Sequence, residues 1–170
     1  MFFPFMVPQE SIIAARYWRI RRTAAGNLWD LQGNASNGIW ESSDKSGTNL
    51  ASGLTYSGGI SFRNSGGSVS TLGGSYQTNI LDSSSGRLTA ANGNDDTALR
   101  LDFGSDKIIG SIRYSVLSSN PERQPPDMEL EYSHDDSVWT AYATLTSTLT
   151  FVNVSWTDIM LGATVASVDV

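Results

Sequence analysis

The sequence predicts an all-β fold of antiparallel strands, and three observations lead to it. Apolar residues make up 39% of the 170 residues and charged residues only 16%, while glycine, serine, threonine and asparagine are frequent. That composition is typical of strands joined by polar loops and not of a helical bundle. Apolar and polar residues also alternate along several segments, which glycine-rich or proline-rich stretches separate. The length suits a single domain with its own core.

Residues 1–14 form an apolar N-terminal arm that precedes the predicted domain at 15–170. The prolines Pro4 and Pro8 exclude a regular helix through it. A secretory signal is not expected, because the basic start and the long unbroken apolar stretch are both missing. An arm of this kind either folds back on its own barrel or docks on another subunit, and the sequence leaves both open. The residues that would anchor it are Phe2, Phe3, Phe5 and Met6.

Residues 15–23 are rich in strand-forming side chains and predict the first strand. They also carry the basic cluster of an acidic chain, formed by Arg16, Arg19, Arg21 and Arg22. We expect a solvated strand face that is paired with nearby carboxylates, rather than a binding patch. Between residues 27 and 96 the pattern is weaker, with glycine-rich turns and a short strand at 60–63.

The clearest alternation lies in residues 98–139. Leu99, Leu101 and Phe103 alternate with polar neighbours, which predicts a half-buried strand that ends at Gly104. A second strand is predicted with an apolar face of Ile108, Ile112, Tyr114 and Val116. A third, after a proline-rich break, is predicted with an apolar face of Met128, Leu130 and Tyr132 and a solvated face of Glu129, Glu131 and Ser133.

Residues 134–137 are a predicted polar turn, after which Val138 starts a fourth strand, and alternation resumes in the tail from 141 to 170. The core is predicted from side chains on the apolar faces of these segments. They are Trp18, Leu101, Phe103, Ile112, Tyr114, Leu130 and Trp139.

Parts of this region resemble the discoidin family, the coagulation factor 5/8 type C domains. The step Asp102-Phe103-Gly104 and the segment Ser133-x-Asp135-Asp136-x-x-Trp139 resemble the family pattern D-L-G … S-x-D-G-x-x-W. Asp136 stands where the family usually has glycine, a mild departure because Asp tolerates left-handed turn positions. The resemblance implies an antiparallel jelly-roll β-sandwich of the discoidin, galactose-binding-like type.

A second resemblance concerns R-Y-W-R-I at 16–20, followed by T-A-A. It is similar to the strand that begins discoidin-like repeats in phage tail and fibre proteins, whereas ordinary discoidin domains carry such a segment near their end. This similarity implies a circularly rearranged barrel, with the 16–23 strand paired to residues 99–103 or to the C-terminal strands.

Candidate binding residues come from the loop-rich half. Aromatic faces for stacking on sugars and polar groups for their hydroxyls are available at Trp40, Tyr56, Arg63, Tyr76 and Arg87. The segment around Asp82 resembles the family's cation loop, although Ser83 replaces its glycine and Leu88 stands near its tryptophan position. One carboxylate with carbonyls makes a weak Ca²⁺ site, so a solvated turn is favoured and no cofactor is required.

Enzymatic activity is not expected. The chain has one histidine, His134, and it lies in a polar turn, where a Ser-His-Asp triad would lack an oriented base. Glu129 and Glu131 could be taken for a glycosidase pair, but neighbours on one strand face are more often solvated. Without cysteine, a thiol nucleophile and a thiolate metal site are excluded. A net charge of −6 disfavours nucleic acid, and no apolar run is long enough for a membrane span.

Two functions remain. The first is a bacteriophage virion structural protein (a tail, fibre or decoration/adaptor component) that contacts other virion proteins or its own copies through the arm. The second is a free-standing carbohydrate-binding module for a cell-surface glycan. The two can coincide in one domain, and the fold alone does not decide between them. The expected location is the virion, assembled in the host cytoplasm.

Overall fold

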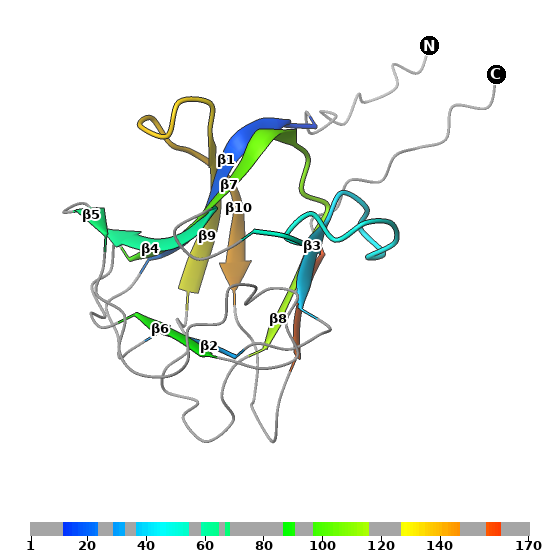
Figure 1. The fold of residues 1–170 in the computed structure, drawn as a ribbon, viewed down its shortest axis with the longest axis horizontal. Coiled ribbons are helices and arrows are strands. Elements are labelled where there is room, and N and C mark those ends of the chain that lie inside the picture. Colours follow the sequence, from blue (N-terminus) through cyan, green and yellow to red (C-terminus); the bar gives the residue numbers. More distant parts are fainter. Residues whose placement is uncertain are drawn as a thin grey trace, which may run out of the picture.

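The computed structural model describes residues 12–23, 29–32, 37–54, 59–64, 67–68, 87–90, 97–115, 127–146 and 156–160. Within these ranges the regular structure consists of strands, all paired antiparallel (Figure 1). The all-β, antiparallel fold class predicted from the sequence is therefore confirmed. None of the described segments is a helix with the length and apolar character to cross a bilayer.

The larger sheet, sheet A, is organised around the first strand of the chain. Its order among the described residues is β10 (Thr140–Thr146), β9 (Asp127–Ser133), β1 (Ala15–Arg22), β7 (Ala98–Lys107), β4 (Ile60–Asn64) and β5 (Gly67–Ser68). Strand β1 thus lies between β9 and β7. The predicted pairing of the 16–23 strand with residues 99–103 is confirmed.

The smaller sheet, sheet B, has the order β11 (Trp156–Met160), β8 (Ser111–Ser115), β2 (Trp29–Gln32) and β6 (Arg87–Ala90) in the described residues. Strand β3 (Gly38–Trp40) also pairs with β8. In Figure 1, β1, β7 and β4 lie in the upper part of the view, and β2 and β6 in the lower part.

Apolar side chains from both sheets form one core. Sheet B contributes Ile39 and Ile112 to it, and most other members come from sheet A and the segments beside it. The buried cluster contains Ala15, Trp18, Ile20, Ile39, Ala51, Ile60, Phe62, Leu99, Leu101, Ile109, Ile112, Met128 and Leu130. The two sheets are therefore held together by removing apolar surface from water.

The core predictions are confirmed for Trp18, Leu101, Ile112 and Leu130. Phe103 packs against the cluster and is only partly buried. Trp139 is half-buried and lies outside the core, so that prediction was wrong. The side chain of Tyr114 lies outside the described part of the chain. The indole of Trp18 donates from Nε1 to the carbonyls of Ala15 and Lys107, at 2.9 and 3.1 Å.

Strand β7 continues past Gly104, contrary to the prediction. Its ladder with β1 pairs Tyr17 with Asp102 and then Ala15 with Lys107, which leaves an irregular stretch in between. Gly104 lies in that stretch with a φ of 73°, and its backbone N–H donates to Asp102 Oδ1 at 2.9 Å. One type of β-bulge has a glycine in this left-handed conformation, so we infer that Gly104 bends the strand and does not end it.

The start of β8 also differs from the prediction. The strand begins at Ser111, and the buried isoleucine before it is Ile109, while Ile108 is half-buried. Ser111 is fully buried, and its hydroxyl donates to the Ser42 carbonyl at 2.6 Å. Gly110 donates its N–H to the Trp40 carbonyl at 2.8 Å. These bonds fix the segment that follows β3 against the start of β8.

Candidate functional site

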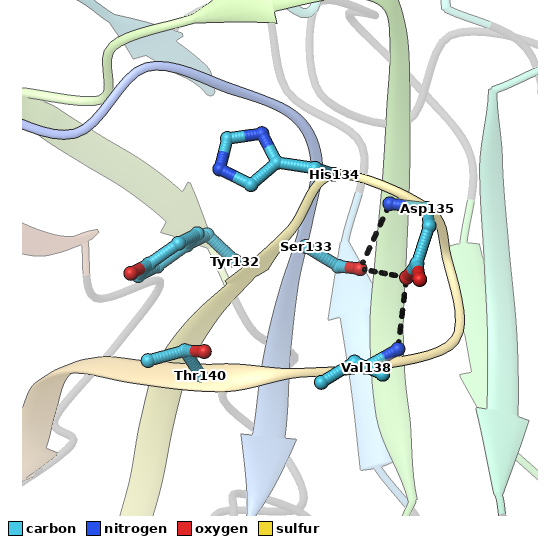
Figure 2. A pocket seen from close by; sticks show the side chains of 6 residues that line it. All are labelled: Tyr132, Ser133, His134, Asp135, Val138 and Thr140. Atoms are coloured by element: carbon cyan, nitrogen blue, oxygen red, sulfur yellow. Dashed lines mark hydrogen bonds between the residues drawn. The ribbon is translucent and has the colours of Figure 1, made fainter.

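The turn between β9 and β10, residues 133–138, is closed by the carboxylate of Asp135. Asp135 Oδ1 accepts hydrogen bonds from the Ser133 hydroxyl at 3.0 Å and from the backbone N–H of Val138 at 2.9 Å (Figure 2). It also accepts a hydrogen bond from the backbone N–H of Ser137 at 2.9 Å. These bonds, with those from Val138 and Ser137 foremost, hold the pKa of Asp135 far below its usual range. The carboxylate is therefore ionised at neutral pH and keeps the turn closed.

The next residue, Asp136, ties the turn to the middle of sheet A. Its φ is 62°, the left-handed position that the sequence predicted Asp could take. Its two carboxylate oxygens accept from Nε and Nη2 of Arg100 on β7, the Nη2 bond being 2.6 Å long. The Arg100 side chain is only 10% exposed. A two-point bond between a buried guanidinium and a carboxylate fixes both position and direction.

Trp139, just after the turn, is the second anchor. The guanidinium of Arg19 lies 4.3 Å from the centre of its ring. Because Arg19 projects from the outer face of β1, this contact draws Trp139 over that face and away from the core, which explains its partial exposure. The turn is thus attached to β7 through Asp136 and to β1 through Trp139.

The outer face of sheet A carries a ladder of ion pairs. Arg19 binds Glu131, and Arg21 binds both Glu131, at 3.1 Å, and Glu129. Arg16 and Asp102 are joined by two hydrogen bonds of 2.9 and 3.1 Å, which raise the pKa of Arg16 and lower that of Asp102.

The predicted pairing of the basic cluster with carboxylates is confirmed for these arginines. One arginine of the cluster and one carboxylate of the predicted solvated face are more buried than predicted. Arg22 is buried in the interior at 1% exposure, and Glu131, at 6%, lies under its arginine partners. With its charges compensated in this way, the outer face is a weak candidate for binding a polyanion.

An open pocket of about 170 Å³ lies beside the 133–138 turn. Its lining is formed by Tyr132, Ser133, His134, Asp135, Val138 and Thr140 (Figure 2). The rings of Tyr132 and His134 stand at 74° with centres 5.8 Å apart. Val138 is 70% exposed, the largest exposed fraction of an apolar side chain recorded in the described residues. The pocket therefore combines apolar walls with several polar ends.

The residues of the turn do not have the geometry of a Ser-His-Asp triad. In a Ser-His-Asp triad the imidazole lies between the hydroxyl and the carboxylate. Here Ser133 donates directly to Asp135, and the recorded side-chain contact of His134 is with the ring of Tyr132. The described residues also contain no group of three or more acidic or histidine side chains that could hold a metal ion.

The binding residues predicted from the sequence are only partly described. Trp40 ends β3 in sheet B and is half-buried, whereas Arg63 is exposed on β4 in sheet A, where its Nε donates to the Ser61 hydroxyl at 3.2 Å. These two residues lie in different sheets. The backbone of Arg87 begins β6 in sheet B. Outside the described residues lie Tyr56, Tyr76, Asp82, Phe2, Phe3, Phe5 and Met6.

The pocket was missed at the sequence level because 134–137 was interpreted only as a polar turn. A signal was present: an aromatic residue, Tyr132, is second to last in the strand before the turn, and an apolar residue, Val138, follows the five polar residues 133–137. Such spacing brings Tyr132 and Val138 to the same end of a hairpin.

Comparison with known proteins identifies no relative of the chain. No family model, no curated protein and no solved structure matches the chain.

Proposed function

We propose that the chain is a structural protein of a bacteriophage virion, a tail, fibre or decoration component, built on a discoidin-like jelly-roll β-sandwich. It acts without catalysis, through contacts with its own copies, with other virion proteins and with host-surface glycans. The N-terminal arm supplies the protein contacts, and the barrel supplies a rigid body.

The observation that carries this proposal is the conformation of the 133–138 turn. The discoidin pattern S-x-D-G-x-x-W needs a left-handed residue after its Asp, and Asp136 has that conformation at a φ of 62°. The Asp135 carboxylate accepts the backbone N–H groups of Ser137 and Val138, as expected for the Asp of that pattern. The discoidin resemblance gains support from this agreement.

The ion-pair ladder is a second support. Glu131 joins two arginines of β1 across the β1–β9 ladder, and Asp102 joins β7 to Arg16. Networks of paired charges restrict the side chains of neighbouring strands more than isolated surface pairs do. A subunit that transmits load within a particle benefits from such cross-strand links.

The direct test is mass spectrometry of purified particles of the phage that encodes this chain. We expect the chain in density-purified particles, in several copies per particle. Its presence in infected-cell lysate but absence from particles would contradict the proposal.

A second experiment tests the contribution of the arm by deleting it. Removing residues 2–13 should leave the far-ultraviolet spectrum and the melting temperature of the barrel unchanged but abolish its oligomers in size-exclusion chromatography with light scattering. If the shortened chain still assembles, the arm covers its own barrel.

The alternative is a free-standing carbohydrate-binding module, which the open pocket beside Tyr132 favours. Absence from particles together with sugar binding by the monomer would make it the better account. A single shallow site gains useful strength only when several copies act together, so weak monomer binding agrees with either function.

A further inference from the structure

The corner between Tyr132 and His134 offers stacking surface to a small ring. The two aromatic rings are nearly perpendicular, at 74°, and Val138 and Thr140 complete the lining beside them. Thr140 is directly opposite Tyr132 in the β9–β10 ladder. Aromatic faces attract C–H groups as well as other rings, so this corner suits a ligand with an apolar face.

The volume limits the ligand to one ring. The pocket measures about 170 Å³, and a cavity of roughly 150 Å³ in another protein admits one benzene molecule. A second ring would have to extend into solvent. The occupant is therefore a single six-membered ring or the end of a longer chain.

The polar groups at the rim of the pocket favour a ligand that carries hydroxyl groups. In the described contacts no side-chain hydrogen bond engages the Tyr132 phenol, the His134 imidazole or the Thr140 hydroxyl. Together they can donate and accept several hydrogen bonds at the rim of an apolar corner. A ligand with hydroxyls around an apolar face satisfies both kinds of surface at once.

The charge of the turn favours a neutral ligand over an acidic one. Three hydrogen bonds converge on Asp135 Oδ1, and Asp136 is bound at two points by Arg100. Arg100 thus neutralises Asp136, whereas Asp135 stays an anion in the pocket lining. An acidic ligand is disfavoured for this reason.

The pocket is also preorganised. The Asp136–Arg100 bond and the Arg19–Trp139 contact fix the turn on both sides of Val138. A turn that is already ordered loses little conformational freedom when a ligand binds, which leaves more of the contact energy for affinity.

We propose that this pocket binds one neutral sugar ring, the terminal residue of a glycan, with its C–H face in the aromatic corner and its hydroxyls toward His134 and Thr140. This site differs from the loop residues predicted from the sequence. It does not depend on the virion assignment, because a virion protein and a free-standing module could both use it.

The single histidine makes the test direct. His134 is the one histidine in the chain, so its imidazole C–H signals in a ¹H–¹³C NMR spectrum belong to the pocket without assignment. The full chain is titrated with methyl glycosides of the common hexoses and N-acetylhexosamines, and with glycerol as a control that has hydroxyls but no ring. We expect at least one glycoside to shift these signals with a Kd on the order of 1 mM, and glycerol to leave them in place.

Matched variants locate the binding. Thr140→Val keeps the shape and the strand preference of the side chain and removes its hydroxyl, and should weaken binding by roughly three- to tenfold. Arg63→Ala, exposed on β4, should leave the Kd unchanged. Melting temperatures of both variants are compared with the parent, so that a loss of binding is not confused with unfolding.

Three results would overturn the proposal. The first is an absence of shift with every glycoside at about 50 mM, far above the expected Kd. The second is a loss of binding in Arg63→Ala but not in Thr140→Val, which would move the site to the loops. The third is a shift produced by a synthetic peptide of residues 2–13 and by no sugar, which would make the arm the occupant. Particle mass spectrometry is unaffected by any of these results, so the virion proposal stands or falls separately.

Discussion

Two turns of the molecule, residues 42–47 and residues 133–138, share one local pattern. In each, a serine is followed two positions later by an aspartate, and the next residue is a non-glycine at positive φ, Lys45 at 63° and Asp136 at 62°. In each, the aspartate accepts a backbone N–H two residues further along, from Ser46 and Ser137 respectively, both at 2.9 Å. The short polar side chains thus set the shape of both turns.

The two turns differ in what attaches them to the sheets. The 42–47 turn is attached through the backbone, since Ser111 donates to the Ser42 carbonyl and Gly110 packs directly under Glu41. The 133–138 turn is attached through side chains, by Arg100 to Asp136 and Arg19 to Trp139. Backbone attachment needs close approach, whereas long side chains hold a turn at a distance. The second turn can therefore border an open pocket.

The largest expected effect is at the backbone attachment, with Gly110→Ala. A Cβ at this position would lie 2.1 Å from the Glu41 carbonyl oxygen, and backbone on both sides leaves little room to move. We expect a loss of about 3 kcal/mol in the free energy of unfolding, measured by urea denaturation.

The control for it is Gly47→Ala in the 42–47 turn. Gly47 has a φ of 90° with nothing within 4 Å of an added Cβ, so its cost is conformational, about 1 kcal/mol. If Gly110→Ala costs no more than Gly47→Ala, close approach is not what fixes this turn.

The side-chain attachment is tested with Asp136→Gly. Glycine relieves the positive φ but removes both bonds to Arg100, a guanidinium that is 10% exposed. Because the buried guanidinium loses its two-point partner and keeps only the longer ion pair with Asp102, at 3.8 Å, we expect a net loss of about 2 kcal/mol despite the better turn residue. Asp136→Asn, which keeps one acceptor, should lose less. A glycine variant as stable as the parent would mean that Asp136 serves only the turn.

Acid should weaken the 133–138 turn more than the 42–47 turn. Hydrogen bonds from Val138 and Ser137 lower the pKa of Asp135, and hydrogen bonds from Ser46 lower that of Asp44 by less. A carboxyl with a depressed folded pKa stabilises the fold above its unfolded pKa of about 3.9, and that stabilisation is lost as pH falls toward the folded value.

The corresponding measurement is the melting temperature between neutral pH and about pH 2.5, below the ordinary aspartate pKa. Asp135→Asn should lower it at neutral pH, and the difference from the parent should shrink below about pH 3.9, where Asp135 becomes protonated in the unfolded chain. Asp44→Asn should show the same trend with a smaller amplitude. A difference that stays constant with pH would show that the Asp135 charge does not contribute.

The sequence predicts the buried faces of the strands well, because the two-residue alternation of side chains along a strand is enough to identify them. Alternation placed Trp18, Leu101 and Leu130 in the core, because one face of each strand must be buried whatever its neighbours are. The left-handed conformation of Asp136 agrees with the resemblance, which puts this Asp at a position where the family pattern has glycine.

The errors arose at residues whose burial depends on a contact with a residue far away in the sequence. Trp139 has the residue type of a core position, but the guanidinium of Arg19, far away in the chain, draws it onto the outer face. Glu131 has the residue type of a solvated position, but two arginines cover it. The pocket depends on such contacts as well, because the Asp136–Arg100 bond fixes the turn that lines it. Such contacts become visible only when strand order and register are known.

The smallest expected effect is a gain in the free energy of unfolding, opposite in sign to the loss expected for Asp136→Gly. Lys45→Gly makes the same change as Asp136→Gly at the matching position of the 42–47 turn, whose φ is 63°. Lys45 has a contact of its own, but an ammonium cannot make the two-point bond that joins Asp136 to Arg100, so relief of the left-handed strain should outweigh the contact that is lost. Glycine also gains freedom in the unfolded chain, which offsets part of that relief. We therefore expect a gain of about 0.5 kcal/mol in urea denaturation, against the loss expected for Asp136→Gly. Two losses of equal size would mean that the left-handed residue is anchored alike in both turns, and the distinction between backbone and side-chain attachment would fail.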